Sequence, residues 1–179
     1  MSRLAVKPVT RASWSDFEAL FESKGAPSYC WCMAWRPIED RTEATNADRK
    51  RTLKSFVDRR LPIGIVGYLE KEPVAWCSVA PRSTHVSLSK QQNDGEEGVW
   101  SVTCFFVRRA HRGTGLSGQM LDAAIAYAKK KGARIIESYP VDPESPSYRF
   151  MGFVELFEKR GFAEIGRAGT RRHIMRLTL

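Results

Sequence analysis

The chain has 179 residues, of which 42% are hydrophobic and 11% aromatic, and its formal net charge is +9. This length and composition predict one globular domain over residues 1–179 and argue against disorder outside short loops. The chain start lacks an apolar signal-peptide core, and no later run is long and apolar enough to span a membrane, so we expect a soluble, cytoplasmic protein. The basic charge favours an anionic partner, such as nucleic acid, an anionic substrate or phosphate groups.

The cysteine content argues against two classes of protein. Four cysteines lie at positions 30, 32, 77 and 104, which is too few for a disulfide scaffold, so we interpret them as free thiols in a reducing compartment. The chain has no Cys-x-x-Cys pair and no histidine at ligand spacing, and we therefore expect no metal. No function is assigned to the Cys30-Trp-Cys32 segment, because buried cysteine is commonly just a small hydrophobic residue.

The apolar pattern predicts strands and helices over the whole chain. A polar helix over residues 43–60 has only a thin apolar stripe, so its basic residues indicate a solvated face. The polar run 82–98 predicts an excursion loop, with one helical turn at most. The expected strands cover residues 4–9, 63–69, 74–80, 99–107, 134–139, 162–165 and 172–177, and the expected helices cover 14–24, 43–60, 116–131 and 147–160, the last capped by Ser147.

An aromatic and sulfur-rich segment follows the first expected helix. Residues 29–37 carry Tyr29, Trp31 and Trp35 together with two cysteines. A connecting segment with such side chains must either bury them or use them to line a pocket. Both interpretations stay open at this stage: a packed loop anchor, or the wall of a substrate site.

Residues 99–131 carry the strongest pattern in the chain. Residues 99–107 are apolar or β-branched almost without a break, which predicts a strand buried on both faces. From Leu116 the apolar residues recur mostly at three- or four-residue spacing, which predicts an amphipathic helix that ends near Gly132.

A basic turn with glycines joins this strand to this helix. Gly113 and Gly115 let the backbone approach an anion, Arg112 adds positive charge, and the first helical amides point outward unpaired. These features predict a phosphate cradle, although an ordinary tight turn would have the same glycines. A Walker A lysine is missing from the sequence, so ATP is a weak candidate, and glycine spacing alone is weak evidence for a dinucleotide.

Two of these motifs resemble the GNAT acyltransferases. The family's coenzyme A signature is a strand that ends in Val, a short linker, and Gln or Arg-x-x-Gly-x-Gly or Ala at a helix start. This chain has Val107 and then Arg112-Gly-Thr-Gly115-Leu-Ser117, with Ser117 where the family has Gly or Ala. Leu156-Phe-Glu-Lys-Arg-Gly-Phe162 is similar to the family's LYEKxGF element. The resemblance covers nearly the whole chain, and the Cys-Trp-Cys step resembles that of an uncharacterised bacterial branch.

The resemblance implies an α/β (α+β) fold with a mixed, mostly antiparallel central sheet flanked by helices. It also implies that strands 99–107 and 134–139 splay apart, so that acetyl-CoA, the cosubstrate, binds in the gap. The segment between the first two helices helps to form the acceptor site in the family, which implicates Tyr29, Trp31 and Trp35. Carried over from the motif, the cofactor-binding residues are Phe105, Phe106, Val107, Arg112, Gly113, Thr114, Gly115, Leu116, Ser117 and Gly118.

The implied reaction is direct attack of a primary amine on acetyl-CoA, with the backbone N–H of Phe105 stabilising the oxyanion. Some relatives keep a basic glutamate where this chain has Ser101, so Glu97 and Glu137 are substitutes by location, each with a plain surface-acid alternative. The family's acidic tyrosine is Phe157 here. Tyr148 is the nearest phenol, and solvent is the alternative proton donor. Cys104 as an acyl carrier is disfavoured, because strand alternation puts it opposite Phe105.

Three functions follow from the sequence. The first is an acetyl-CoA-dependent N-acetyltransferase acting on a small-molecule or peptide amine of unknown identity. The second is a basic nucleic-acid-binding module, which the charge permits but no recognition motif supports. The third is a GNAT-fold protein that binds a CoA ester without transferring it. We expect no membrane partner, and a homodimer is one expected assembly because homodimers are frequent in the family.

Overall fold

The computed structural model describes residues 4–86, 88 and 95–179, and its strands form one seven-stranded sheet. The strand order is β1-β2-β3-β4-β5-β7-β6, and β4–β5 is the parallel pair in a sheet whose other pairings are antiparallel. This confirms the predicted mixed, mostly antiparallel α/β fold. The strands are β1 (Ala5–Pro8), β2 (Ile65–Leu69), β3 (Glu72–Pro81), β4 (Val99–Val107), β5 (Ile135–Ser138), β6 (Ala163–Ala168) and β7 (Arg172–Thr178).

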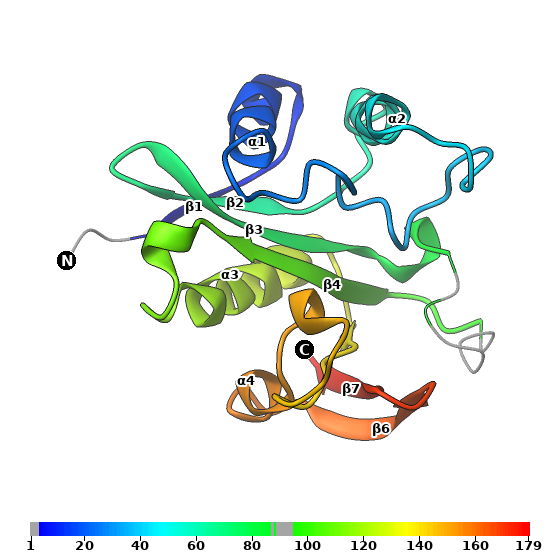
Figure 1. Cartoon of the computed structure of the whole chain (residues 1–179). Helices are drawn as coiled ribbons and strands as arrows, with labels where there is room; N and C mark the ends of the chain where they lie inside the picture. Colours follow the sequence, from blue (N-terminus) through cyan, green and yellow to red (C-terminus); the bar gives the residue numbers. More distant parts are fainter. Residues whose placement is uncertain (1–3, 87, 89–94) are drawn as a thin grey trace.

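Helices cover both faces of the sheet. Figure 1 shows α1 and α2 together on one face and α3 on the other. A capping box starts α2, because Thr45 Oγ1 accepts from the Asp48 N–H at 3.1 Å and Asp48 Oδ2 accepts from the Thr45 N–H at 2.9 Å. The helices are α1 (Trp14–Phe21), α2 (Asn46–Asp58), α3 (Leu116–Lys130) and α4 (Val154–Glu158), with 3-10 turns η1 (Arg11–Ser13), η2 (Arg82–Thr84), η3 (Arg109–His111) and η4 (Arg149–Met151).

The sheet separates two apolar layers. On the α3 side, the predicted stripe of the helix is buried, and Met120, Leu121 and Ala124 pack against β3 and β4. On the α1 and α2 side, Phe17 and Trp76 are fully buried with their ring centroids 4.7 Å apart. The strand pattern of β4 therefore reflects burial on both faces, as its apolar sequence predicts.

A bulge interrupts the pairing of β4 with β3. Ser78 pairs with Cys104 and Val79 pairs with Val102, so Thr103 has no partner residue on β3. Such an extra residue reverses the alternation of side chains along a strand. Beyond the bulge, Phe105 packs on the α3 side and Cys104 on the α1 side, as predicted for this pair.

The two central strands part after a short parallel ladder. β4 and β5 are paired from Val99 with Ile135 to Val102 with Ser138, and the ladder ends there. The predicted splay is therefore present, and it begins next to the bulge. Beyond this point the edge of β4 is no longer paired with β5, and it faces the space between the two diverging strands.

Two predicted segments differ in the structure. The helix expected over residues 147–160 is only η4 followed by α4, because Tyr148 and Gly152 have φ of 60° and 89° and interrupt helical geometry. Ser147 therefore caps no helix there. The loop 82–98 begins with the one expected turn, η2, whereas residues 87 and 89–94 lie outside the described residues.

Candidate active site

A cavity of about 680 Å³ lies beside the second half of β4, where β5 has departed. Its walls come from three parts of the chain: the segment after α1, β4 with the start of α3, and the segment from η4 to α4. The described residues that line it are Gly25, Pro27, Tyr29, Cys30, Cys32, Ala34, Trp35, Thr103, Cys104, Phe105, Phe106, Val107, Arg112, Ser117, Arg149, Phe150, Gly152, Phe153 and Leu156.

The glycine turn beside this cavity leaves its backbone accessible to a ligand. Gly113 and Gly115 have φ of 76° and 80°, in the left-handed region that favours glycine, and a Cβ at either position would meet nothing within 4 Å. The space beside the turn is therefore open. α3 begins at Leu116 directly after Gly115 and has no acidic residue in its first turn. Its first amides and its positive dipole end are available to a phosphate group.

The charged side chains that line the cavity are basic. Arg112 and Arg149 are lining residues, and the described lining contains no Asp or Glu. Arg112 is fixed by its Nε, which donates to the Val107 carbonyl at 3.0 Å, while Arg149 lies over the Phe153 ring at 4.9 Å. An elongated ligand with phosphate at one end fits this charge distribution better than a cation would.

The segment that follows β5 returns along the open side of β4. The Val141 N–H donates to the Gly152 carbonyl at 3.0 Å, which holds this segment together. A Cβ on Gly152 would lie 3.4 Å from Phe105 and 2.9 Å from Phe157, so the backbone approaches the Phe105 ring closely. This segment therefore encloses the gap beside β4 without filling it. Backbone groups of a strand edge in such a gap need hydrogen-bond partners, and an amide-bearing ligand such as pantetheine can supply them.

The three predicted acceptor residues lie in different surroundings. Tyr29 is 70% exposed and lines the cavity, as does Trp35. Trp31 is 3% exposed and lies in the core, where its ring centroid is 5.4 Å from that of Phe21. For Trp31 the structure therefore favours the packed-anchor interpretation, because its ring faces α1 and not the cavity.

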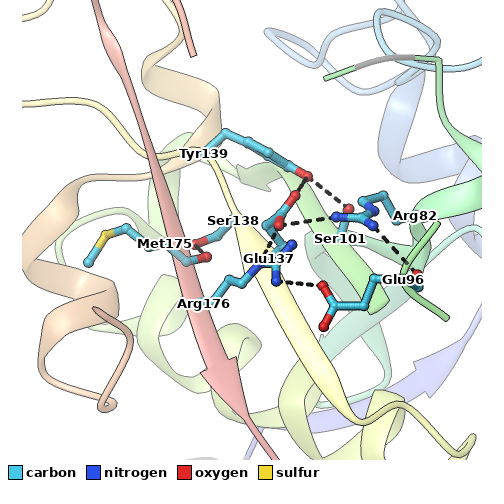
Figure 2. A network of polar contacts seen from close by, with 8 residues as sticks. All are labelled: Arg82, Glu96, Ser101, Glu137, Ser138, Tyr139, Met175 and Arg176. Atoms are coloured by element: carbon cyan, nitrogen blue, oxygen red, sulfur yellow. Dashed lines mark hydrogen bonds and ion pairs between the residues drawn. The ribbon is translucent and has the colours of Figure 1, made fainter. Parts of the chain in front are cut away.

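Glu137 is fully buried within a polar network that joins β4, β5 and β7 (Figure 2). Its Oε2 accepts from Arg176 Nε at 2.6 Å and lies 3.3 Å from Arg82 Nη1, and its Oε1 accepts from the Tyr139 hydroxyl at 2.6 Å. The Tyr139 hydroxyl also lies 3.1 Å from Ser101 Oγ. Glu137 is no lining residue of the cavity, and these contacts favour a structural role for its carboxylate.

The other two predicted catalytic side chains are not among the described lining residues of this cavity. Glu97 precedes β4 and borders a separate hollow with Arg82 and His85. Tyr148 adjoins the cavity, because its ring packs near the lining residues Trp35 and Phe150. Tyr148 packs between Trp35 and Arg172, with a centroid distance of 6.3 Å to the former and with the guanidinium 5.1 Å from its ring.

No group of His, Cys, Asp or Glu side chains in the described part of the chain has the arrangement of a metal site. Among the same residues, no helix is long and apolar enough to cross a membrane.

The sequence pattern of the Acetyltransferase (GNAT) family matches residues 14–162. This chain belongs to the GNAT acetyltransferase family. The matched range contains the glycine turn, the bulged strand and the element from Leu156 to Phe162, so the cavity lies inside the part that identifies the family. No match was found among curated proteins.

Solved GNAT structures share the fold of this GNAT chain at low identity. An aminoglycoside acetyltransferase in complex with coenzyme A has 14% identity and a TM-score of 0.65, covering 98% of this chain and 95% of that one. PaiA N-acetyltransferase from Thermoplasma acidophilum, also with coenzyme A, has 12% identity, a TM-score of 0.60 and 99% coverage of both chains. Ribosomal-protein-alanine N-acetyltransferase from Brucella melitensis has 16% identity and a TM-score of 0.59, covering 98% of this chain and 99% of that one. Coenzyme A is thus a ligand of this fold, in agreement with the predicted acetyl-CoA.

Sequence reasoning missed part of this GNAT cavity. Arg149, Gly152 and Phe153 line it from a segment that was expected to be helical. The signal for an irregular segment was present in Pro143, Pro146 and Gly152, which punctuate residues 140–152. Cys32 was missed for a different reason, because nothing in the local pattern shows which side chains it meets.

Proposed function

We propose that the protein is an N-acetyltransferase that transfers the acetyl group of acetyl-CoA directly to a primary amine. One observation supports this most: a single cavity joins an anion-binding turn to the open edge of a bulged, splayed strand. The turn suits the pyrophosphate, and the edge suits the pantetheine amides. The family membership of the chain agrees with this assignment.

The proposed cofactor contacts follow the cavity from the turn to the bulge. Backbone amides of residues 113–118 and the Arg112 side chain would hold the phosphates, and Phe106 and Val107 would pair with pantetheine. The backbone N–H of Phe105 would donate to the thioester carbonyl and stabilise the oxyanion that forms on attack. Leu116 and Gly118 are buried beside the cavity, Gly118 packs next to Arg160, and both would contribute through their backbone amides.

The acceptor would enter between the segment after α1 and η4. Tyr29 and Trp35 line the cavity from the segment after α1. Arg112 and Arg149 make the cavity positive, which disfavours a polycationic acceptor. An alkylamine with a pKa of about 10.4 is neutral in roughly one molecule in 2,500 at pH 7, so the acceptor must lose a proton before it attacks.

A matched pair of substitutions tests the cofactor site. Ser117 lines the cavity in the first turn of α3, where a negative side chain stabilises a helix. Ser117→Glu should therefore fold well, yet weaken acetyl-CoA binding by about tenfold or more through repulsion of the phosphates. Ser117→Gln has nearly the same size without the charge and should keep more of the affinity. Isothermal titration calorimetry on both variants and the wild type measures this.

The transfer itself requires a second measurement. Release of free coenzyme A thiol from acetyl-CoA, recorded over a panel of amines, distinguishes an acetyltransferase from a protein that only binds the CoA ester. Binding without thiol release across the panel would support the non-catalytic alternative. Absence of binding, combined with salt-dependent affinity for DNA or RNA, would support the nucleic-acid alternative.

A further inference from the structure

Arg36 is a buried cation whose hydrogen bonding is incomplete. The residue is 1% exposed, and its Nη2 donates to the Ile63 carbonyl at 2.7 Å and to Ser78 Oγ at 3.0 Å. Its Nε and Nη1 are also buried, and neither has a hydrogen-bond partner among the described residues. Guanidinium stays protonated in proteins, so a charge buried in this way requires a nearby anion.

Thiols supply the available anion. None of the ion pairs found between described residues joins Arg36 to a carboxylate. Burial lowers the pKa of Arg36, and the nearby Cys32 and Cys104 oppose that shift by electrostatic attraction. On another side lies His85, and burial followed by the Arg36 charge lowers the pKa of its imidazole well below the ordinary value. His85 is therefore neutral, and it is half-buried.

The surroundings of Cys32 select it as the thiolate of the cluster. The neighbouring Cys104 thiol contributes most to lowering the pKa of Cys32 to about 6, and the Arg36 charge adds to this effect against the cost of burial. Ser78 on β3, which accepts from Arg36 Nη2 at 3.0 Å, acts in the same direction. The Cys104 thiol donates to the Phe105 carbonyl at 3.8 Å, and the proximity of Cys32, then burial, raises its pKa. Burial raises the pKa values of Cys77 and Cys30.

A constrained turn directs Cys32 towards β4. Trp31 and Cys32 have φ of 49° and 55°, two consecutive non-glycine residues in the left-handed region. Backbone bonds of 3.0 Å from the Cys30 and Trp31 N–H groups to the Pro27 carbonyl hold the turn, and the Trp31 ring anchors it in the core. Such conformations persist where the surrounding structure enforces them, and they are frequent at functional sites.

Cys32 and Cys104 both line the proposed acetyl-transfer cavity, and Cys104 is adjacent in sequence to Phe105. The described lining contains no Asp, Glu or His, so it offers no other side chain that ordinarily accepts a proton near pH 7. We propose that Cys32, paired with Arg36, is a thiolate that accepts the proton of the acceptor ammonium. This inference rests on the proposed function, because a base is needed only if an amine is acetylated.

In the proposed reaction the acceptor ammonium first transfers one proton from nitrogen to Cys32 Sγ, which gives a neutral amine and a thiol. The amine then forms a C–N bond with the acetyl carbon as the C–S bond to coenzyme A breaks, and the second nitrogen proton goes to the departing thiolate. Cys32 returns to its thiolate form by releasing its proton to solvent.

The first experiment tests the thiolate without any turnover. Iodoacetamide alkylation of the free protein is followed from pH 5 to pH 10, with mass spectrometry to separate Cys32 from the other three cysteines. The alkylation midpoint of Cys32 should lie near pH 6. In Arg36→Met it should move towards the ordinary thiol value of about 8.5, and Arg36→Gln, which also removes the charge, is used if Arg36→Met does not fold. A wild-type midpoint at the ordinary thiol value would overturn the proposal.

The second experiment tests the base. Cys32→Ser should lower kcat with an alkylamine acceptor by about 100-fold, the usual contribution of a general base, and should leave acetyl-CoA affinity unchanged. Cys77→Ala is the matched control, because Cys77 is a fully buried cysteine in the apolar layer on the α3 side and is no lining residue of the cavity. Its kcat should stay close to that of the wild type.

The protonation state of the acceptor separates a base from a nucleophile. An acceptor that is already neutral at pH 7, such as a hydrazide, needs no base, so the defect of Cys32→Ser should shrink with it. An equal defect with both acceptors, or an acetyl group trapped on Cys32 after incubation with acetyl-CoA alone, would overturn the base role. Acetyl-CoA binding without turnover of any amine would refute the proposed function and the base, whereas the alkylation result would stand independently.

Discussion

Two buried arginine clusters on this sheet are organised in opposite ways. Around Glu137, one carboxylate holds Arg82, Arg176 and the Tyr139 hydroxyl within hydrogen-bond or ion-pair distance. Around Arg36, two guanidinium nitrogens lack hydrogen-bond partners among the described residues, and the nearby acids are thiols. The first cluster joins three strands, whereas the second borders the cavity.

The difference lies in what each acid can do when its surroundings change. The Glu137 carboxylate is held by two guanidinium groups and one hydroxyl, so it stabilises geometry and is unavailable for chemistry. A thiolate that depends on one arginine and one neighbouring thiol can take up and release a proton near neutral pH. Glu137, a catalytic candidate by its location, therefore has the contacts of a structural residue. Cys32, whose residue type suggested a packing role, has the surroundings of a reactive thiol.

Removing the carboxylate should have the largest effect on stability. Glu137→Ala removes the fully buried acid shared by the half-buried Arg82 and Arg176, of which Arg176 keeps its ion pair with Glu96, and breaking a buried pair in this way costs roughly 3–5 kcal/mol. The free energy of unfolding, from urea denaturation monitored by circular dichroism, measures this loss. Glu97→Ala is the control, because Glu97 is exposed, and it should change stability by less than about 0.5 kcal/mol. A stable Glu137→Ala protein that has lost turnover would instead support the catalytic role.

The thiolate should make stability depend on pH. The pKa of Cys32 falls from 9.0 to about 6 on folding, so the stabilisation is fully present above pH 9 and is lost as the pH falls through 6. The difference in unfolding free energy between the wild type and Cys32→Ser should grow over this window by at most about 4 kcal/mol. Urea titrations at several pH values measure it. A difference that stays constant from pH 6 to pH 9 would mean that Cys32 is a neutral thiol.

Arg36→Met should cost less stability than Glu137→Ala. When the arginine is removed, Cys32 can neutralise itself by binding a proton, and replacing a buried ion pair with apolar atoms is often close to neutral. We expect a loss below about 2 kcal/mol at pH 7, against roughly 3–5 kcal/mol for the carboxylate. Urea unfolding of both variants under the same conditions gives the comparison. A larger loss for Arg36→Met would indicate that its bonds to Ile63 and Ser78 matter more than its charge.

The sequence was sufficient for elements whose pattern is local. β4 and α3 begin at the predicted residues, because a continuous apolar strand, two glycines and an amphipathic stripe follow one another in the chain. The conformation of the glycine turn that we propose as the phosphate cradle was predictable for the same reason. Its glycines, basic residues and helix start lie within residues 108–118, so their spacing alone places them together.

Features that depend on tertiary contacts were not predictable in the same way. The Arg36 and Cys32 pair depends on Cys104, which lies 68 positions beyond Arg36, and on a left-handed turn at two residues that seldom adopt it. Residues 147–153 carry enough helix-forming residues to suggest a helix, yet Tyr148 and Gly152 take positive φ where the segment returns beside β4. In both places long-range packing overrides local propensity.

The smallest effect is expected from the phenol that the family resemblance implicates as an acid. Tyr148→Phe keeps the ring, and with it the contacts to Trp35 and Arg172, so only the hydroxyl is tested. Because Tyr148 is no lining residue of the described cavity, we expect kcat and acetyl-CoA affinity to stay near wild-type values. Coenzyme A thiolate, with a conjugate acid of pKa near 8.5, can be protonated by solvent or by the amine itself. Steady-state kinetics with an active acceptor decides the matter, since loss of a true general acid would lower kcat by about 100-fold.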